Sequence, residues 1–186
     1  NLNALSDAML DALKLNFEDI QHSREIKAVI IKAAGRAFCP GHDLKEMQEK
    51  RNLKNDGGKA YFEELLSKCT YVMKLIRELP QPVIAEVHGV AAAAGCQLVA
   101  TCDIAVASEE ASFGVNGVDI GLFCSTPMVA LSRNINRKKA FEMLTTGDFL
   151  DPFQEGDFHF YDFIFYYVDI IKIAMYRSQE WYISKK

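Results

Sequence analysis

The amino-acid sequence predicts an α/β domain, in which buried strands alternate with helices. Runs rich in β-branched residues, such as IKAVIIKA at 26–33 and PVIAEVHG at 82–89, are typical of buried parallel strands. Segments with apolar residues at helical spacing lie between these runs. Hydrophobic residues make up 49% and charged residues 25% of the 186 residues, the usual balance of a folded globular protein.

The chain opens with a helical pattern at 3–22, whose start Asn3 or Ser6 can cap. The strand at 26–33 comes next, and we expect residues 37–44 to form a loop. Asp43 in that loop can cap the segment after it.

Residues 45–56 are charged and lack an apolar face, which predicts a solvated, mobile segment. A long amphipathic helix is predicted at 59–79, and it stops before Pro80.

The second half continues the alternation. After the strand at 82–89, the alanine-rich run predicts a helix at about 94–101, and DIAVAS at 103–108 predicts another strand. We expect a short strand at 112–114 and a glycine-rich loop at 114–127. Two more helices are predicted, and their ranges are 127–135 and 137–146.

Charge and cysteine usage exclude several classes of protein. The net charge is −4, so no basic surplus indicates a nucleic-acid or anionic-membrane partner. The five cysteines include no CxxC pair, which favours reduced, buried thiols, and the four histidines show no metal-ligand spacing with them. We therefore expect no metal site.

Two loops share one geometry, CPGHD at 39–43 and AAAG at 92–95. Each follows a predicted strand, precedes a predicted helix and carries small residues around a glycine. Helix N-termini leave backbone N–H groups unpaired, and two such groups aimed at one point form an oxyanion hole. The alternative is that the small residues only let helix and strand pack closely.

Several motifs in register carry a resemblance to a known family. They are GRAFCPGHDLKEM (35–47), VIAEVHGVAAAAGCQLVATCDIAVAS (83–108), SFGVNGVDIGL (112–122) and RKKAFEMLTTG (137–147). Together they resemble the crotonase superfamily, the enoyl-CoA hydratase/isomerase family. The likeness is greatest to one branch that shares GHDLKE, AAGCQLVA and GLFCSTP. The resemblance implies the crotonase-like (ClpP/crotonase) spiral of ββα units.

The resemblance also implies a substrate class and an oxyanion hole. Family members bind acyl-CoA thioesters, with coenzyme A as part of the substrate and no separate cofactor. Their thioester enolate is stabilised by two backbone N–H groups, which correspond here to His42 and Ala94. The role uses the main chain of His42, so its imidazole is not required.

Further positions match the family's substrate-binding segments. The residues that correspond to the path of adenine and pantetheine are Arg36, Ala37 and Phe38. The residues beside the two donors that we expect to contact substrate are Gly41, Asp43 and Gly95.

The two catalytic glutamates of active hydratases are missing. Their positions correspond to Gln97 and Gly117, which cannot act as general acid or base. Asp119 lies two residues after Gly117 and would point to the same side of an extended segment, so it is a candidate substitute. The alternative for Asp119 is a turn or cap residue.

The resemblance covers about residues 1–150, and residues 151–186 form an atypical tail. Of the 20 aromatic residues, 11 lie in that tail. Its apolar stretch at 158–176 includes Asp162 and Asp169, each of which would cost about 2.5–3.5 kcal/mol at the centre of a membrane helix, so we expect no membrane span. Three hypotheses remain for the tail: a packed helix, an aromatic β-prone stretch, and a truncated, out-of-frame end.

The sequence supports three hypotheses of function: an acyl-CoA enzyme of the family, a non-catalytic acyl-CoA-binding pseudoenzyme, or an inactive truncated fragment. The resemblance implies a homotrimer or hexamer, which the truncated or replaced C-terminal part puts in question. No segment marks secretion. The expected location is cytoplasmic, with the mitochondrial matrix as the alternative.

Overall fold

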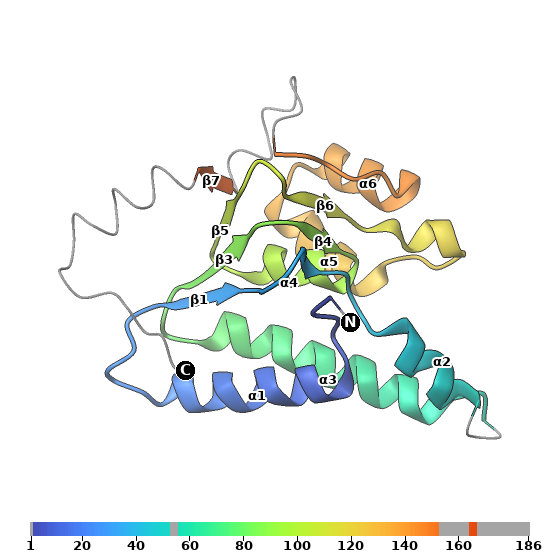
Figure 1. Cartoon of the computed structure of the whole chain (residues 1–186), viewed down its shortest axis with the longest axis horizontal. Helices are drawn as coiled ribbons and strands as arrows, with labels where there is room; N and C mark the ends of the chain where they lie inside the picture. Colours follow the sequence, from blue (N-terminus) through green and yellow to red (C-terminus); the bar gives the residue numbers. More distant parts are fainter. Residues whose placement is uncertain (1, 53–55, 153–163, 167–186) are drawn as a thin grey trace.

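Parallel strands form two sheets in the computed structural model, which describes residues 2–52, 56–152 and 164–166 (Figure 1). The larger sheet has the order β1-β3-β5-β7, with the bounds Val29–Lys32, Val83–Val87, Ile104–Ala107 and Ile164–Tyr166. The smaller sheet has the order β2-β4-β6, with the bounds Ala37–Cys39, Val90–Ala92 and Ser112–Gly114. This arrangement confirms the α/β prediction.

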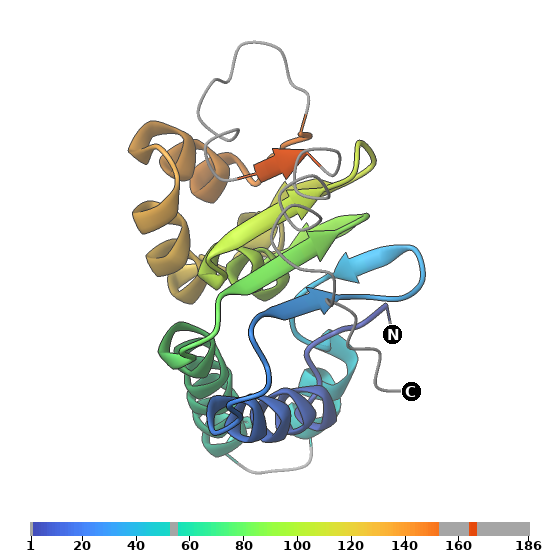
Figure 2. The ribbon, with the colours of Figure 1, turned by 90° about the vertical axis from the view of Figure 1, so that its left-hand side faces the viewer.

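The larger sheet is closely packed at its centre. Ala85 of β3 is paired with Ile31 of β1 and with Ala105 of β5. Ala85 and Ala105 are completely buried, and so is Val83 at the start of β3. Small side chains in the central strands leave room for close packing against the sheet. Figure 2 shows the strands of the larger sheet side by side, from the blue β1 through the green β3 and the yellow-green β5 to the red β7. Small residues in these strands therefore set the thickness of the core.

Helices cover the sheets on more than one side. α1 (Asp7–Gln21) and α3 (Lys59–Glu78) lie side by side (Figure 1). α4 (Ala94–Thr101) packs against α5 (Ser125–Asn134), which in turn contacts α6 (Arg137–Thr146). The predicted helices at 3–22, 59–79, 94–101, 127–135 and 137–146 are therefore present, with α1 shorter at its start than its prediction.

The structure shows which of the two candidate residues, Asn3 or Ser6, caps the start of α1. Ser6 is the cap, because its hydroxyl accepts a hydrogen bond from the N–H of Met9 at 3.2 Å. Asn3 instead donates its side-chain amide to the carbonyl oxygens of Ala34 and Ala37, at 2.8 and 2.9 Å. Asn3 thereby ties the first residues of the chain to β2.

Four segments differ from what the sequence analysis expected. Residues 37–39 of the predicted loop form β2, and residues 90–92 form β4, because each short run pairs along its backbone in the smaller sheet. Most of the segment predicted to be solvated and mobile is α2 (Leu44–Asn52), which has no buried residue. Part of the predicted glycine-rich loop is a 3-10 helix, η1 (Asn116–Ile120).

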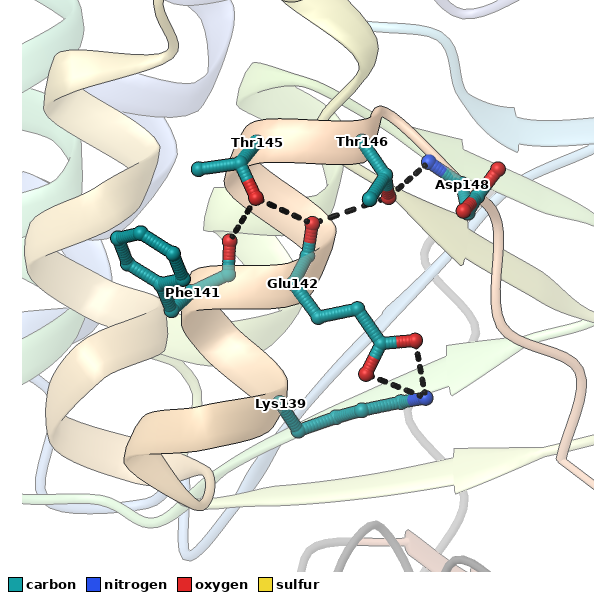
Figure 3. A network of polar contacts seen from close by, with 6 residues as sticks. All are labelled: Lys139, Phe141, Glu142, Thr145, Thr146 and Asp148. Carbon is teal, nitrogen blue, oxygen red and sulfur yellow. Dashed lines mark hydrogen bonds and ion pairs between the residues drawn. The ribbon is translucent and has the colours of Figure 1, made fainter.

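Side chains from the last turns of α6 form hydrogen bonds with the backbone at the end of the helix (Figure 3). The hydroxyl of Thr145 donates to the carbonyl oxygen of Phe141 at 2.8 Å, and that of Thr146 donates to the carbonyl oxygen of Glu142 at 3.0 Å. The hydroxyl of Thr146 then accepts from the N–H of Asp148 at 3.1 Å, beyond the left-handed Gly147. This closure leads the chain to Leu150, which pairs with Phe113.

The tail lies mostly outside the described residues. Its described part, β7, continues the larger sheet beside β5, so a β-prone stretch is present at 164–166. The packed helix and the truncated, out-of-frame end concern residues that lie outside the described part. Among the described residues, no helix is long and apolar enough to cross a membrane, and no group of three metal-ligating side chains is found.

Candidate functional site

Three strand ends of the smaller sheet bring the predicted residues to one place. The strands β2, β4 and β6 are parallel, so their carboxyl ends lie at the same edge of the sheet. The segments that follow them contain Gly41, Ala94 and Gly117. The crevice beyond the carboxyl ends of parallel strands is where α/β sheets bind ligands.

The first two segments touch. A Cβ atom at Gly41 would lie 3.4 Å from the backbone nitrogen of Ala94 and 3.1 Å from the Cβ of Ala93. Gly41 itself has a φ of +99°, a value that favours glycine. Its carbonyl oxygen accepts a hydrogen bond from the N–H of Leu5 at 2.8 Å, which fixes the loop. The structure therefore brings the two predicted loops together.

The turn before α4 is strained. Ala93 has a φ of 49° and a ψ of −117°, a combination that L-residues rarely adopt. Its N–H donates to the carbonyl oxygen of Gly114 at 2.8 Å, which holds the turn against β6. The turn presents Ala94 as the first residue of α4, so the N–H of Ala94 has no acceptor within the helix.

His42 is half-buried beside the N-terminal segment. Its Nδ1 lies 3.4 Å from the carbonyl oxygen of Leu5. Burial lowers the pKa of His42 below 6.5, and the Leu5 carbonyl and the Asp7 carboxylate oppose that shift. The imidazole is therefore held toward its neutral form. Among the described residues, no acceptor takes the backbone N–H of His42.

Gln97 lies at the end of the first turn of α4, three residues after Ala94. Its backbone N–H donates to the carbonyl oxygen of Ala93 at 3.0 Å. Gln97 is only 7% exposed, and its Oε1 has no hydrogen-bond partner among the described residues. Among the residues classed as buried, Gln97 and Gln81 are the polar ones. An unpaired buried acceptor of this kind calls for an explanation.

Gly117 has no room for a side chain. A Cβ atom there would lie 2.8 Å from the Sγ of Cys124 and 2.8 Å from the carbonyl oxygen of Leu122. Burial raises the pKa of Cys124, and a hydrogen bond from the backbone N–H of Gly117 opposes that shift. The half-buried thiol of Cys124 therefore fills the space that a side chain at position 117 would need.

Asp119 does not have the geometry that its prediction assumed. The segment is the 3-10 helix η1 rather than an extended strand, so Asp119 and Gly117 do not share a side. Asp119 is exposed, and its carboxylate accepts from the side chain of Asn116 at 3.3 Å. This environment is that of the predicted alternative, a turn residue.

Comparison with known proteins adds an independent observation. The family model described as "Enoyl-CoA hydratase/isomerase" matches residues 1–155. The chain belongs to the enoyl-CoA hydratase/isomerase family. It is 53% identical over 146 residues to human enoyl-CoA hydratase domain-containing protein 3, mitochondrial, and this match covers 78% of the chain and 46% of the relative. This relative represents the branch of the family that shares the motifs GHDLKE, AAGCQLVA and GLFCSTP with the chain.

Two solved structures show the same fold. The human enoyl Coenzyme A hydratase domain-containing protein 3 superposes with a TM-score of 0.79 and 45% identity, covering 93% of this chain and 66% of that chain. An enoyl-CoA hydratase from Mycobacterium smegmatis superposes with a TM-score of 0.74 and 54% identity, covering 80% of this chain and 56% of that chain. The chain spans about half the length of the curated relatives it matches.

Within this crotonase-type fold, the segment expected to meet coenzyme A is β2 and the residue before it. Arg36 is exposed, whereas the side chains of Ala37 and Phe38 are 5% and 2% exposed. The side chain of Phe38 belongs to the core, so this strand offers a ligand mainly its backbone. Asn3 already occupies the carbonyl oxygen of Ala37.

Asp43 organises the segment after His42. Its carboxylate accepts from the N–H groups of Lys45 and Glu46, at 3.1 and 3.2 Å, and so caps α2 as the sequence predicted. Glu46 in turn accepts from the N–H of Asp7 at 3.0 Å. Asp43 therefore acts as a cap in this structure, and Glu46 holds α2 against the start of α1.

Sequence reasoning missed two residues that shape this family site. Asn3 holds the start of the chain against β2, which precedes the Gly41–His42 loop, and Glu46 holds α2, which follows that loop, against the start of α1. Their contacts span 34 and 39 positions of the chain. No local pattern indicates such distant pairs, although Asn3 lies in the NALS segment that precedes the first helix.

Proposed function

We propose that the chain binds an acyl-CoA thioester, with the backbone N–H groups of His42 and Ala94 donating to the thioester carbonyl oxygen. Support comes from the contact between the two loops and from the absence of a partner for either N–H among the described residues. The N-terminus of α4 adds partial positive charge at the place where an enolate oxygen gains negative charge. Coenzyme A enters as part of the substrate, with no separate cofactor.

The chemistry on that thioester is enolate stabilisation without the usual pair of carboxylates. The amide of Gln97 cannot take a proton at neutral pH, and Gly117 has no side chain. Asp119 is exposed, and it lies on a different side of η1 from Gly117. Hydration at the rate of an ordinary hydratase is therefore not expected of this chain.

The second candidate is a non-catalytic acyl-CoA binder, which the residues at positions 97 and 117 favour. Neither the Gln97 amide, whose Oε1 is unpaired among the described residues, nor Gly117, against which the Cys124 thiol packs, supplies a carboxylate. The third candidate is the inactive fragment that the sequence analysis left open.

Binding separates the first two candidates from the third. Calorimetry compares butyryl-CoA, its thioether analogue S-butyl-CoA and free coenzyme A on the full chain. The thioether lacks the carbonyl oxygen, so losing two hydrogen bonds should weaken binding by about tenfold. Equal affinities for thioester and thioether would contradict the role of the two N–H groups. No binding of any of the three supports the inactive fragment.

Turnover separates the enzyme from the binder. The variant Gln97→Glu/Gly117→Glu restores both carboxylates, and Cys124→Gly is added to remove the thiol that a side chain at position 117 would meet. We expect this variant to hydrate crotonyl-CoA faster than the wild type. Wild-type hydration at an ordinary hydratase rate would refute the non-catalytic alternative, and unchanged activity in Asp119→Asn would remove Asp119 from consideration.

The cellular setting of the proposal follows the relatives. Several of them carry "mitochondrial" in their names, which favours the mitochondrial matrix over the cytoplasm that the sequence suggested. The proposed partner is the acyl-CoA substrate, with no nucleic acid, and the proposed assembly is the family's homotrimer or hexamer. Import into isolated mitochondria and light scattering of the purified chain test these two statements.

A further inference from the structure

One segment of the chain combines exposed apolar side chains with cations. Residues 120–141 include four cations and no aspartate or glutamate, although the whole chain has a net charge of −4. Five large apolar side chains of this segment are exposed, by fractions between 44% and 68%: Ile120, Leu122, Phe123, Val129 and Phe141. Single exposed apolar residues are ordinary, but a gathering of this kind indicates a binding surface.

The elements that carry these residues pack against one another. α6 contacts both α5 and η1, and the loop between η1 and α5 carries Leu122 and Phe123. Figure 2 shows α5 and α6, in orange, together at one side of the molecule and apart from α1 and α3. We call the exposed side chains of this segment the 120–141 surface, which consists of Ile120, Leu122, Phe123, Val129, Arg133, Arg137, Lys138 and Phe141.

Each of the two helices places an exposed cation beside an exposed apolar side chain. On α5, Val129 and Arg133 are four positions apart and therefore share one face of the helix. On α6, the same spacing joins Arg137 to Phe141. The two arginines lie on either side of the short connection between the helices. The cations of the 120–141 surface therefore border its apolar side chains.

Three of the four cations have no carboxylate partner within the described part of the chain. Lys139 pairs with Glu142 at 3.3 Å on the surface of α6. Arg133, Arg137 and Lys138 take part in none of the ion pairs of the described residues. These three side chains are exposed, so their charges are available to an anionic ligand.

An anionic phospholipid membrane fits this combination of side chains. Apolar side chains enter the boundary between headgroups and acyl chains, and cations beside them are attracted to lipid phosphates. A nucleic acid would also attract the cations, but Ile120, Leu122 and Val129 have no ring that could stack on a base. A second copy that met this surface with its own would bring like charges together.

We propose that the 120–141 surface docks the protein onto membranes that contain anionic phospholipids. Its apolar side chains enter the headgroup region, and its three unpaired cations contact lipid phosphates. The inference goes beyond acyl-CoA binding and does not depend on it, because no residue of this surface is among those proposed to hold the thioester.

Vesicle sedimentation tests the docking on the full chain. One set of vesicles contains phosphatidylcholine and cardiolipin in equal masses, and the other contains phosphatidylcholine alone. The wild type should bind the mixed vesicles at least about tenfold more tightly, because each cation near an anionic surface contributes about fivefold. Added salt should weaken the binding, because it screens the attraction between the cations and the lipid phosphates.

An apolar substitution assigns the binding to this surface. Phe141→Gln should weaken binding to the mixed vesicles by about tenfold, because it removes a ring that enters the membrane. The control Leu15→Gln removes an apolar side chain of similar exposure, 61%, from α1 and should bind as the wild type does. Both side chains are exposed, so both variants should fold, and circular dichroism checks this.

A charge substitution tests the cations in the same way. Arg133→Gln/Arg137→Gln should weaken binding to the mixed vesicles by about 25-fold, fivefold for each cation. The control Lys74→Gln/Arg77→Gln makes the same change in net charge at exposed positions of α3. This control should keep most of the binding, because its two cations lie outside the surface.

Several results would overturn the inference. Equal binding to both kinds of vesicle would remove the role of the cations, and full binding by Phe141→Gln would place the contact elsewhere. If the wild type binds neither kind of vesicle, the membrane role is wrong. Size-exclusion chromatography then shows whether Phe141→Gln changes the oligomeric state, in which case the surface is a contact between copies. Binding of a short RNA without binding to vesicles would assign the surface to nucleic acid instead.

Discussion

The backbone of Gly95 lies directly against the carbonyl group of Cys39. A Cβ atom at Gly95 would overlap the carbonyl oxygen of Cys39 and lie 2.9 Å from its Cβ. This contact joins the start of α4 to the end of β2, the two segments that carry Ala94 and His42. The glycine therefore sets the distance between the two proposed N–H donors.

Replacing Gly95 with alanine tests this contact. The obstacle is backbone, which cannot turn away as a flexible side chain can, so we expect Gly95→Ala to lower the free energy of unfolding by about 3 kcal/mol. Denaturant unfolding measures the change. In the control Gly121→Ala, nothing lies within 4 Å and only the left-handed φ of +75° resists, which costs about 1 kcal/mol. Equal costs would contradict the close approach.

Strain at Ala93 predicts a stabilising substitution. A glycine would relieve about 1–3 kcal/mol of backbone strain, and the added freedom of the unfolded chain would offset about 0.4–1 kcal/mol of that. We expect Ala93→Gly to raise Tm. Ala94→Gly, whose backbone is already helical, should lower Tm instead. A lower Tm for Ala93→Gly would mean that the turn is unstrained.

Gly117 and Cys124 should behave as a coupled pair. We expect Gly117→Ala to destabilise the protein by about 1–3 kcal/mol, because its Cβ meets the Cys124 thiol and the Leu122 carbonyl. In the Cys124→Gly background the same substitution should cost at least about 0.5 kcal/mol less. Unfolding free energies of the four proteins of this cycle give the coupling. Additive effects would show that the thiol does not occupy this space.

The half-buried His42 predicts an acid-sensitive stability. Burial lowers the pKa of the folded imidazole below 6.5, so the unfolded chain binds more protons as the pH falls from above 6.5 toward the folded pKa. Stability should therefore decline across that interval. The decline should be smaller in His42→Gln than in the wild type, whereas the control His22→Gln should retain it. An unchanged decline in His42→Gln would place its cause elsewhere.

The sequence predicts those parts of the fold that local patterns encode. Long helices such as α3 carry an apolar stripe, and β-branched runs such as those of β1 and β3 indicate buried strands. The short strands β2 and β4 escape prediction because three residues form no period. They are strands because they pair with each other across the chain, and β4 also pairs with β6.

The candidate site was predictable where main-chain geometry follows from residue type. Glycine at 41 and small residues at 92–95 indicate the close approach that the structure contains. The role expected of Asp119 assumed an extended backbone. That role was not predictable, because the segment forms the 3-10 helix η1 instead. The packing of Cys124 at Gly117 joins positions seven apart through a turn that composition does not specify.

The central claim is that two backbone N–H groups hold a thioester carbonyl. Infrared difference spectroscopy of butyryl-CoA labelled with ¹³C at its carbonyl measures this directly on the full chain. We expect the bound carbonyl to absorb at a lower frequency than it does in water. The shift should diminish in Ala94→Pro, which removes one N–H at the first position of α4. A bound carbonyl that absorbs at the same frequency as in water would contradict the account.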